Sequence, residues 1–243
     1  GGRFPDGRSS YEVLADLVPL PPSRPAILDL ACGDGPLSAR VLDRNPGAQV
    51  VGIDLSGVEI ERARARGLAA RFHAARAQEL PLADSSQDIV LCHMALMLMD
   101  DVEAVVGELS RFTRPGGQLG LIVGGGIRAG DAWALYADLW RAELRRVGGA
   151  LPPLGDDRTR DAGGLRALFV DWEVVSIQER LLEIGGSLED VLRRLELSYL
   201  PALLPPEGRL GLADRFRAEA PGLAREGHIP CGLRLITLEA RRG

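Results

Sequence analysis

Short apolar segments alternate with helical segments from residue 26 to residue 123, and this alternation constrains the fold more than any other feature of the chain. Apolar runs that are too short for helices and hydrophobic throughout indicate strands buried on both faces. Strands joined in this way by helices form a parallel sheet that helices cover on both sides. We expect strands over 26–31, 49–54, 71–75, 88–93 and 118–123, and helices over 36–43, 57–66 and 102–112.

The regular alternation ends at three consecutive glycines, residues 124–126. The predicted fold class is α/β: a doubly wound, mostly parallel, seven-stranded Rossmann-like sheet with a helical lid inserted in the C-terminal half. A short helix over 11–18 precedes the sheet. The C-terminal half is expected to hold a helix over 131–147, a strand over 172–182, a mostly helical stretch over 187–220 and a last strand over 229–240.

Composition narrows the classes of partner. The formal net charge is −5 and no long basic run occurs, so electrostatics gives no reason to expect a nucleic-acid partner. No apolar stretch approaches the ~20 residues that cross a bilayer, and we expect a cytoplasmic protein without a membrane partner. The three cysteines, Cys32, Cys92 and Cys231, lack metal-type spacing and are expected to be free thiols.

The strongest chemical signal lies in residues 27–38, where an apolar strand meets a turn with Gly33 and Gly35 and then a helix start. Glycines there let the backbone approach a ligand at the carboxyl end of the sheet. If this turn bound the pyrophosphate of a dinucleotide, acidic side chains should be scarce around it, because they would repel the phosphates. Instead, Asp29 lies on the strand and Asp34 lies between the glycines. Carboxylates in this place suit a ligand with an ammonium group, a sulfonium and ribose hydroxyls.

A further carboxylate ends the second strand. Asp54 follows Gly35 by nineteen residues and is well placed to accept hydrogen bonds from both ribose hydroxyls. The same placement occurs in NAD sites, so it does not separate the two kinds of cofactor. It does argue against a ribose that carries a 2′-phosphate.

Four blocks, taken in order, resemble the class I S-adenosylmethionine-dependent methyltransferases, particularly the small-molecule branch with the ubiquinone and menaquinone methyltransferases. The blocks are the turn at 29–35, the segment 51–56, the loop 77–88 and the turn 114–117. The ordered set is far more specific than any one block. The resemblance implies S-adenosylmethionine as the cofactor and methyl transfer as the activity.

The resemblance also implies roles for single residues. Backbone groups around Ala31 and Gly33 would hold the amino acid part of the cofactor, Asp54 would hold the ribose, and Leu55 would cover one face of the adenine. The complete set of expected cofactor-binding residues is Tyr11, Asp29, Ala31, Gly33, Asp34, Gly35, Asp54, Leu55, Ser56, Ala77, Gln78 and His93.

At the adenine edge, the resemblance places Ala77 and Gln78. The family usually has an acidic residue before that alanine, whereas this chain has Arg76. We therefore expect recognition of the adenine amino group to pass to Gln78 or to backbone groups.

His93 ends the strand that would lie beside the sulfonium. It is the candidate catalytic base, because imidazole titrates near neutral pH, and the alternative is that it only lines the cofactor pocket. A base is needed only when the acceptor must lose a proton. Cys32, Cys92 and His93 could meet at adjacent strand ends, but without paired spacing we expect no metal site.

Aromatic residues mark the C-terminal half. Trp133, Tyr136 and Trp140 share one helical face, which is typical of core packing, although such a face can also line a substrate pocket. Tyr199, within the apolar stretch 195–206, has the same two interpretations. Because segments over the carboxyl edge of such sheets often supply specificity, we keep all four as candidate substrate-binding residues of a lid over a moderately apolar small molecule.

The predicted function is methyl transfer to an oxygen, nitrogen or carbon atom of a small molecule, with secondary metabolism as the favoured setting. Two alternatives stay open: an NAD-dependent oxidoreductase, which Asp29 and Asp34 disfavour, and a protein that uses the cofactor for binding, regulation or a non-methylating reaction. The predicted organisation is a cap segment at 1–25, a cofactor-binding core at 26–126, a lid or substrate region with one core strand at 127–228, and a final core strand at 229–243.

Overall fold

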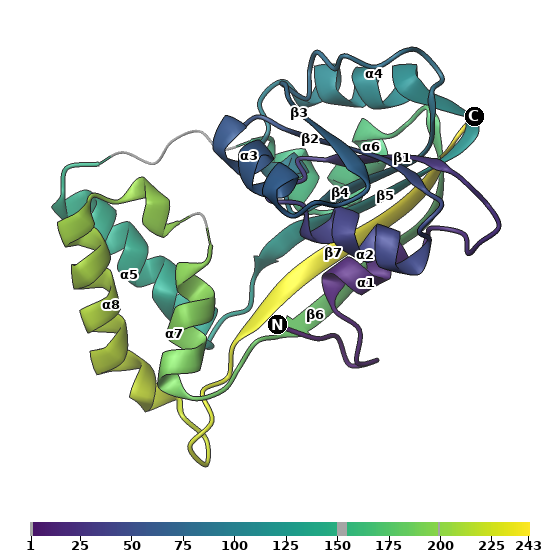
Figure 1. The fold of residues 1–243 in the computed structure, drawn as a ribbon. Coiled ribbons are helices and arrows are strands. Elements are labelled where there is room, and N and C mark those ends of the chain that lie inside the picture. The colour runs from purple at the N-terminus through teal and green to yellow at the C-terminus, as the bar shows by residue number, and fades with distance from the viewer. Residues whose placement is uncertain (1, 150–154, 199) are drawn as a thin grey trace. The chain divides into compact units, whose positions relative to one another are not determined.

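The computed structural model describes residues 2–149, 155–198 and 200–243 and divides the chain into two compact units (Figure 1). The sheet unit comprises Arg8–Gly125, Leu154–Arg180 and Leu235–Gly243, and the helical unit comprises Gly1–Gly7, Gly126–Pro153 and Leu181–Arg234. None of the helices in the described residues is long and apolar enough to cross a membrane.

Seven strands form one sheet in the order β3-β2-β1-β4-β5-β7-β6, which confirms the predicted fold class. Within the part of the sheet ordered β3-β2-β1-β4-β5, adjacent strands pair in parallel. Figure 1 shows that β7 lies beside β5 and runs in the opposite direction, towards the C-terminus. The strands are β1 (Ala26–Leu30), β2 (Gln49–Asp54), β3 (Ala70–Ala74), β4 (Gln87–His93), β5 (Thr113–Ile127), β6 (Trp172–Glu183) and β7 (Gly232–Arg242).

The helices are divided between the two units. In the sheet unit they are α1 (Ser10–Ala15), α2 (Pro36–Arg44), α3 (Gly57–Ala65), α4 (Val102–Phe112) and α6 (Ala162–Leu168); in the helical unit they are α5 (Ala132–Arg146), α7 (Leu188–Glu196) and α8 (Pro206–Glu219). Short 3₁₀ turns span Leu96–Leu98, Asp157–Arg160, Pro201–Leu203 and Ala220–Leu223.

The first strand decides where a ligand can bind. The residues of β1 are almost entirely buried because β1 pairs with β2 on one side and with β4 on the other. Strand order therefore reverses at β1, and the helices that follow β1 and β4 leave the sheet in opposite directions. A crevice at the carboxyl ends of the strands is expected at such a reversal.

An apolar core holds these strand ends in place. Leu28 in β1, Val90 in β4 and Leu121 in β5 are fully buried, and Leu109 and Phe112 pack on them from α4. Burying each such side chain contributes about 1.5–3 kcal/mol, so the strand tips around the crevice rest on a rigid base.

Several elements differ from the sequence-based prediction. The helix α6 and the 3₁₀ turn before it were not predicted, β5 continues through the three glycines to Ile127 instead of ending at residue 123, and β7 begins at Gly232 instead of residue 229. The helix α1 ends at Ala15, earlier than the predicted end at residue 18. The strand β5 begins at Thr113 instead of residue 118. Residues before and after the predicted turn both pair with β4: Thr113 pairs with Gln87, and Gln118 pairs with Ile89. The turn at 114–117 thus bulges out of a longer strand instead of preceding a short one.

The helical unit has its own core. Asp131 caps α5 by accepting hydrogen bonds from the backbone N–H groups of Trp133 and Ala134, at 3.0 and 3.1 Å. Tyr136 meets Phe216 of α8 edge to face with ring centroids 5.5 Å apart, and the indole N–H of Trp140 donates to the carbonyl oxygen of Leu200 at 2.8 Å. These contacts join α5, α8 and the turn after α7.

Candidate functional site

A cavity of about 340 Å³ lies in the sheet unit at the carboxyl ends of β1, β2 and β4. It is therefore at the strand reversal, where an α/β sheet is expected to bind its ligand. Its lining comes from the ends of these three strands and from the loops after β3 and β4: Leu30, Ala31, Ile53, Asp54, Leu55, Ala75, Arg76, Ala77, Gln78, His93, Met94, Ala95, Leu98, Met99 and Asp100.

Asp54 ties the end of β2 to the glycine turn after β1. One carboxylate oxygen accepts the backbone N–H of Gly33 at 2.8 Å, and the other accepts the backbone N–H of Ser56 at 2.8 Å. The turn can take this path because Gly33 and Gly35 have φ values of 55° and 84°, in the left-handed region that glycine enters without strain. The carboxylate has lone pairs left for ribose hydroxyls, since it can accept about four hydrogen bonds.

The two other predicted carboxylates do not line the cavity. Asp29 is only 1% exposed, and its carboxylate accepts the hydroxyl of Ser38 at 2.6 Å. Burial, reinforced by the nearby Asp54 carboxylate, raises the pKa of Asp29 to about 7. Asp34 points to the surface, where it accepts a hydrogen bond from Arg66 at 2.5 Å. With a pKa of about 7, the Asp29 carboxyl is only partly ionised at neutral pH, and the charge of Asp34 is balanced by Arg66.

His93 lies at the cavity wall with its imidazole already engaged. Its Nε2 is 2.8 Å from the hydroxyl oxygen of Ser10, and its ring stacks on Tyr11 with centroids 4.0 Å apart. Burial lowers the pKa of His93 to about 4, so the ring is neutral at neutral pH. A capping box between Ser9 and Glu12 fixes the start of α1 and thereby the positions of both partners.

The opposite part of the lining is polar. Asp100, from the loop before α4, is bound by Arg76 and Gln78 from the loop after β3. Sequence reasoning did not single out Asp100, because only the fold shows that these two loops meet.

The rest of the wall is apolar and rich in methionine. Met94 and Met99 line the cavity together with Ala95 and Leu98, and the buried Met97 lies between them in the chain. All three methionines of the protein fall in this segment. Sequence reasoning passed over this clustering, which was visible without the structure.

The structure thus brings half of the predicted cofactor residues to one cavity. Tyr11, Gly33 and Ser56 contact lining residues without lining the cavity themselves, and Gly35 caps α2. The predicted residues in the lining are Ala31, Asp54, Leu55, Ala77, Gln78 and His93.

Three of the four predicted substrate residues lie in the helical unit. Tyr136 and Trp140 are buried in its core, which favours packing over ligand contact, whereas Trp133 is half-buried. Tyr199 lies outside the described residues.

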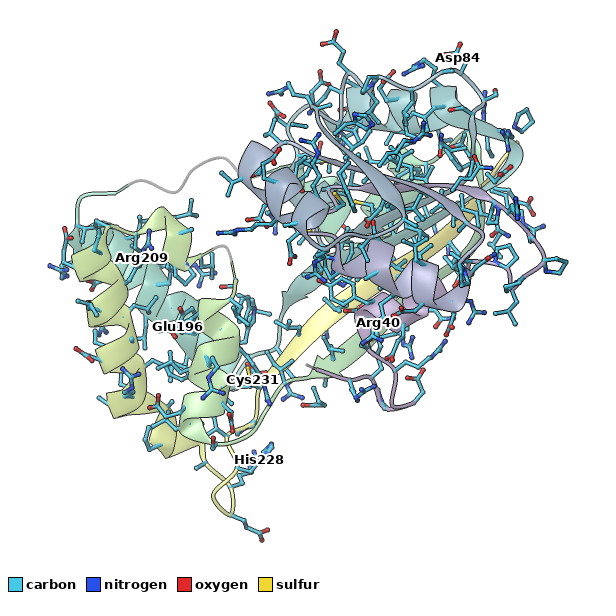
Figure 2. All side chains as sticks on the ribbon, viewed as in Figure 1. Arg40, Asp84, Glu196, Arg209, His228 and Cys231 are labelled. Atoms are coloured by element: carbon cyan, nitrogen blue, oxygen red, sulfur yellow. The ribbon has the colours of Figure 1, made fainter. Side chains whose placement is uncertain are left out.

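The cysteines do not gather into one site. Cys231 belongs to the helical unit, where Figure 2 labels it, and Cys32 and Cys92 belong to the sheet unit; all three are buried free thiols. Within residues 2–149, 155–198 and 200–243, no three His, Cys, Asp or Glu side chains come together as a metal-binding group.

Comparison with known proteins decides the kind of domain, because residues 27–117 match the family described as "Methyltransferase domain". The chain contains a class I methyltransferase domain. The cofactor of this class is S-adenosylmethionine. The donor set of the cavity fits it, since carboxylates and an apolar wall surround the place of a cationic nucleoside.

Curated relatives match part of the chain. Demethylmenaquinone methyltransferase of Thermus thermophilus is 41% identical over 97 residues, which are 38% of this chain and 44% of the relative. Malonyl-[acyl-carrier protein] O-methyltransferase of Hahella chejuensis is 40% identical over 95 residues, 38% of this chain and 34% of the relative. These matches span less than half the length of either relative.

Solved structures share the fold over nearly the whole chain. Geranyl diphosphate C-methyltransferase from Streptomyces coelicolor, in complex with Mg²⁺, geranyl-S-thiolodiphosphate and S-adenosyl-L-homocysteine, superposes with a TM-score of 0.57 at 18% identity, covering 96% of this chain and 75% of that one. The [4+2]-cyclase SpnF superposes with a TM-score of 0.59 at 21% identity, covering 96% and 80%. At these identities the likeness concerns the fold alone.

Proposed function

We propose that the protein transfers a methyl group from S-adenosylmethionine to a small, moderately apolar molecule. The observation that carries this proposal is the cavity at the strand reversal of a methyltransferase domain, with Asp54 on one wall and an apolar methionine-containing segment on another. The match of residues 27–117 to a methyltransferase domain disfavours the NAD-dependent alternative.

In this proposal Asp54 accepts hydrogen bonds from the ribose hydroxyls, and Leu55, an exposed side chain on the cavity rim, covers one face of the adenine. Backbone groups of Ala31 and Gly33 hold the amino acid part. Asp29 and Asp34 have no direct contact with the cofactor in this proposal, because neither lines the cavity. When bound, the cofactor supplies an electrophilic methyl group on a sulfonium.

The protein's main contribution is alignment and exclusion of water, because methyl transfer neutralises a cation and needs no stabilised anion. Tyr11 stacks on His93, which is part of the cavity wall, and thereby supports that wall. His93 stays the candidate base for acceptors that must lose a proton, but because its pKa is lowered to about 4 it is a weak base and suits only an acidic acceptor. Its Nε2 contacts the hydroxyl of Ser10, so the proton would be taken through that hydroxyl, by Nδ1 or after α1 shifts.

The acceptor is proposed to be apolar because Met94, Leu98 and Met99 offer an adaptable hydrophobic wall. Two of the proteins compared above are named for demethylmenaquinone and geranyl diphosphate, which both carry hydrocarbon chains. We further propose that the helical unit, with Trp133 as its half-buried aromatic, is the substrate region, and that the reaction belongs to secondary metabolism.

A second function deserves a direct test, because the cyclase SpnF shares the fold. The chain could use the cofactor site for a non-methylating reaction. Formation of S-adenosylhomocysteine with a panel of small acceptors, followed by mass spectrometry, separates the two functions.

Cofactor binding is tested by calorimetry with S-adenosylhomocysteine. Asp54→Ala should weaken binding about 5- to 150-fold, the equivalent of about 1–3 kcal/mol, because it removes the acceptor for the ribose hydroxyls. Asp43→Ala, on the exposed face of α2, is the matched control and should bind as the wild type does. A protein that ignored S-adenosylmethionine and S-adenosylhomocysteine but bound NADH would refute the proposal.

A further inference from the structure

Three polar side chains meet at one end of the cavity. The guanidinium of Arg76 donates to both carboxylate oxygens of Asp100, at 3.1 Å each. The side-chain amide of Gln78 donates to the backbone carbonyl oxygen of Asp100 at 2.6 Å and to its carboxylate at 2.8 Å. Asp100 is therefore held through both its backbone and its side chain by residues more than twenty positions earlier in the chain.

This end of the cavity must recognise an adenine if the proposed function is correct. The 6-amino group of adenine donates hydrogen bonds, so it needs an acceptor. The guanidinium of Arg76 has only donors, and Gln78 directs its amide nitrogen to Asp100, which leaves its neutral amide oxygen as a weaker acceptor than a carboxylate. Among the described residues that line the cavity, the carboxylates are Asp54 and Asp100. Asp54 already accepts two backbone N–H groups at the glycine turn, on the strand end assigned to the ribose.

We propose that Asp100 accepts a hydrogen bond from the adenine amino group and makes the site specific for a 6-aminopurine. The proposal rests on the proposed function. Charge gives this contact its strength, since a carboxylate is a better acceptor than a neutral carbonyl oxygen. Arg76 and Gln78 are positioning residues in this arrangement: they orient the carboxylate, and Arg76 also balances its charge.

The local backbone supports the same role. Asp100 directly precedes Asp101, whose side chain accepts the backbone N–H of Ala104 and caps α4. The helix cap thus fixes the backbone next to Asp100, and the loop after β3 holds its carboxylate. Preorganised acceptors of this kind lose little conformational freedom when a ligand binds.

The test compares S-adenosylhomocysteine with its 6-oxo analogue, in which hypoxanthine replaces adenine. The wild type should prefer the adenine ligand, because a 6-oxo group places an acceptor against the carboxylate. Asp100→Asn supplies an amide that can donate to the 6-oxo group. Calorimetry should show roughly tenfold weaker binding of S-adenosylhomocysteine by this variant, and its preference between the two ligands should shrink or reverse.

Asp84→Asn is the matched control. Asp84 is in the sheet unit near α4, where Figure 2 labels it, and its side chain is 77% exposed, as is that of Asp100. It also accepts a hydrogen bond from an arginine, Arg111. This control should keep the wild-type affinity for both ligands.

The outcomes separate this inference from the proposed function. If the wild type binds S-adenosylhomocysteine and Asp100→Asn leaves both the affinity and the ligand preference unchanged, the role of Asp100 is wrong while the proposed function stands. If the wild type binds neither ligand, the proposed function fails and the inference falls with it. Because Asp100 is an exposed residue, circular dichroism should show an unchanged fold for the variant.

Discussion

Replacing Asp29 with asparagine should make the protein more stable at alkaline pH. The Asp29 carboxyl is buried, and its pKa is raised from 3.8 to about 7 because burial penalises the charged form and the Asp54 carboxylate repels it. The folded state therefore binds this proton more tightly than the unfolded state does. The stabilisation is complete below pH 3.8 and is lost as the pH rises through about 7.

The size of the effect follows from the shift. About three pKa units at 1.36 kcal/mol each give about 4 kcal/mol between the acid and the alkaline limit. Asparagine cannot ionise, and its side-chain oxygen can still accept the hydroxyl of Ser38. Asp29→Asn should equal the wild type near pH 3.5 and exceed its free energy of unfolding by up to about 4 kcal/mol above pH 8.

Urea denaturation followed by circular dichroism, at several pH values between these limits, measures this difference. Other titrating groups act equally in both proteins and cancel in the comparison. The exposed Asp43→Asn serves as the control and should follow the wild-type curve. Parallel curves for Asp29→Asn and the wild type would show that the pKa of Asp29 is the same in the folded and unfolded states and would refute the reasoning.

Two further predictions concern His93 in the cavity wall and Trp133 in the helical unit. Burial lowers the pKa of His93 from 6.5 to about 4, so its neutral form stabilises the fold above pH 6.5, and about 3 kcal/mol is lost as the pH falls through 4. His93→Phe should abolish that loss in urea denaturation between pH 7 and pH 4. Trp133→Ala should raise the acceptor's KM several-fold in steady-state kinetics with cofactor affinity unchanged; equal losses of both would reject a separate substrate region.

The sheet could be predicted because its signal is local. Each buried strand is a short apolar run, and the strand β1 carries its glycine turn directly after it. Asp54 and Leu55 were found for the same reason, since they end a strand next to that turn. Strands and the residues at their ends can be found from hydrophobic patterns among residues that are close in the sequence.

The polar partners in the site could not be predicted in this way. The hydroxyl of Ser10 meets His93 across 83 positions, and Asp100 meets Arg76 across 24. Each contact depends on how two loops fold over the sheet, and no sequence period encodes that. The sequence showed that Arg76 replaces the usual acidic residue at the expected adenine edge. That Asp100 pairs with Arg76 could be seen only in the structure.

The methionine segment offers a way to observe the site without altering it. Since all three methionines of the protein lie between residues 94 and 99, labelling methionine with ¹³C at its methyl group would place every probe at the cavity wall or directly behind it. A heteronuclear NMR spectrum would then contain three methyl signals from the protein, with no background from the rest of the chain. Titrating candidate acceptors into such a sample would reveal occupancy at this wall before any turnover assay exists.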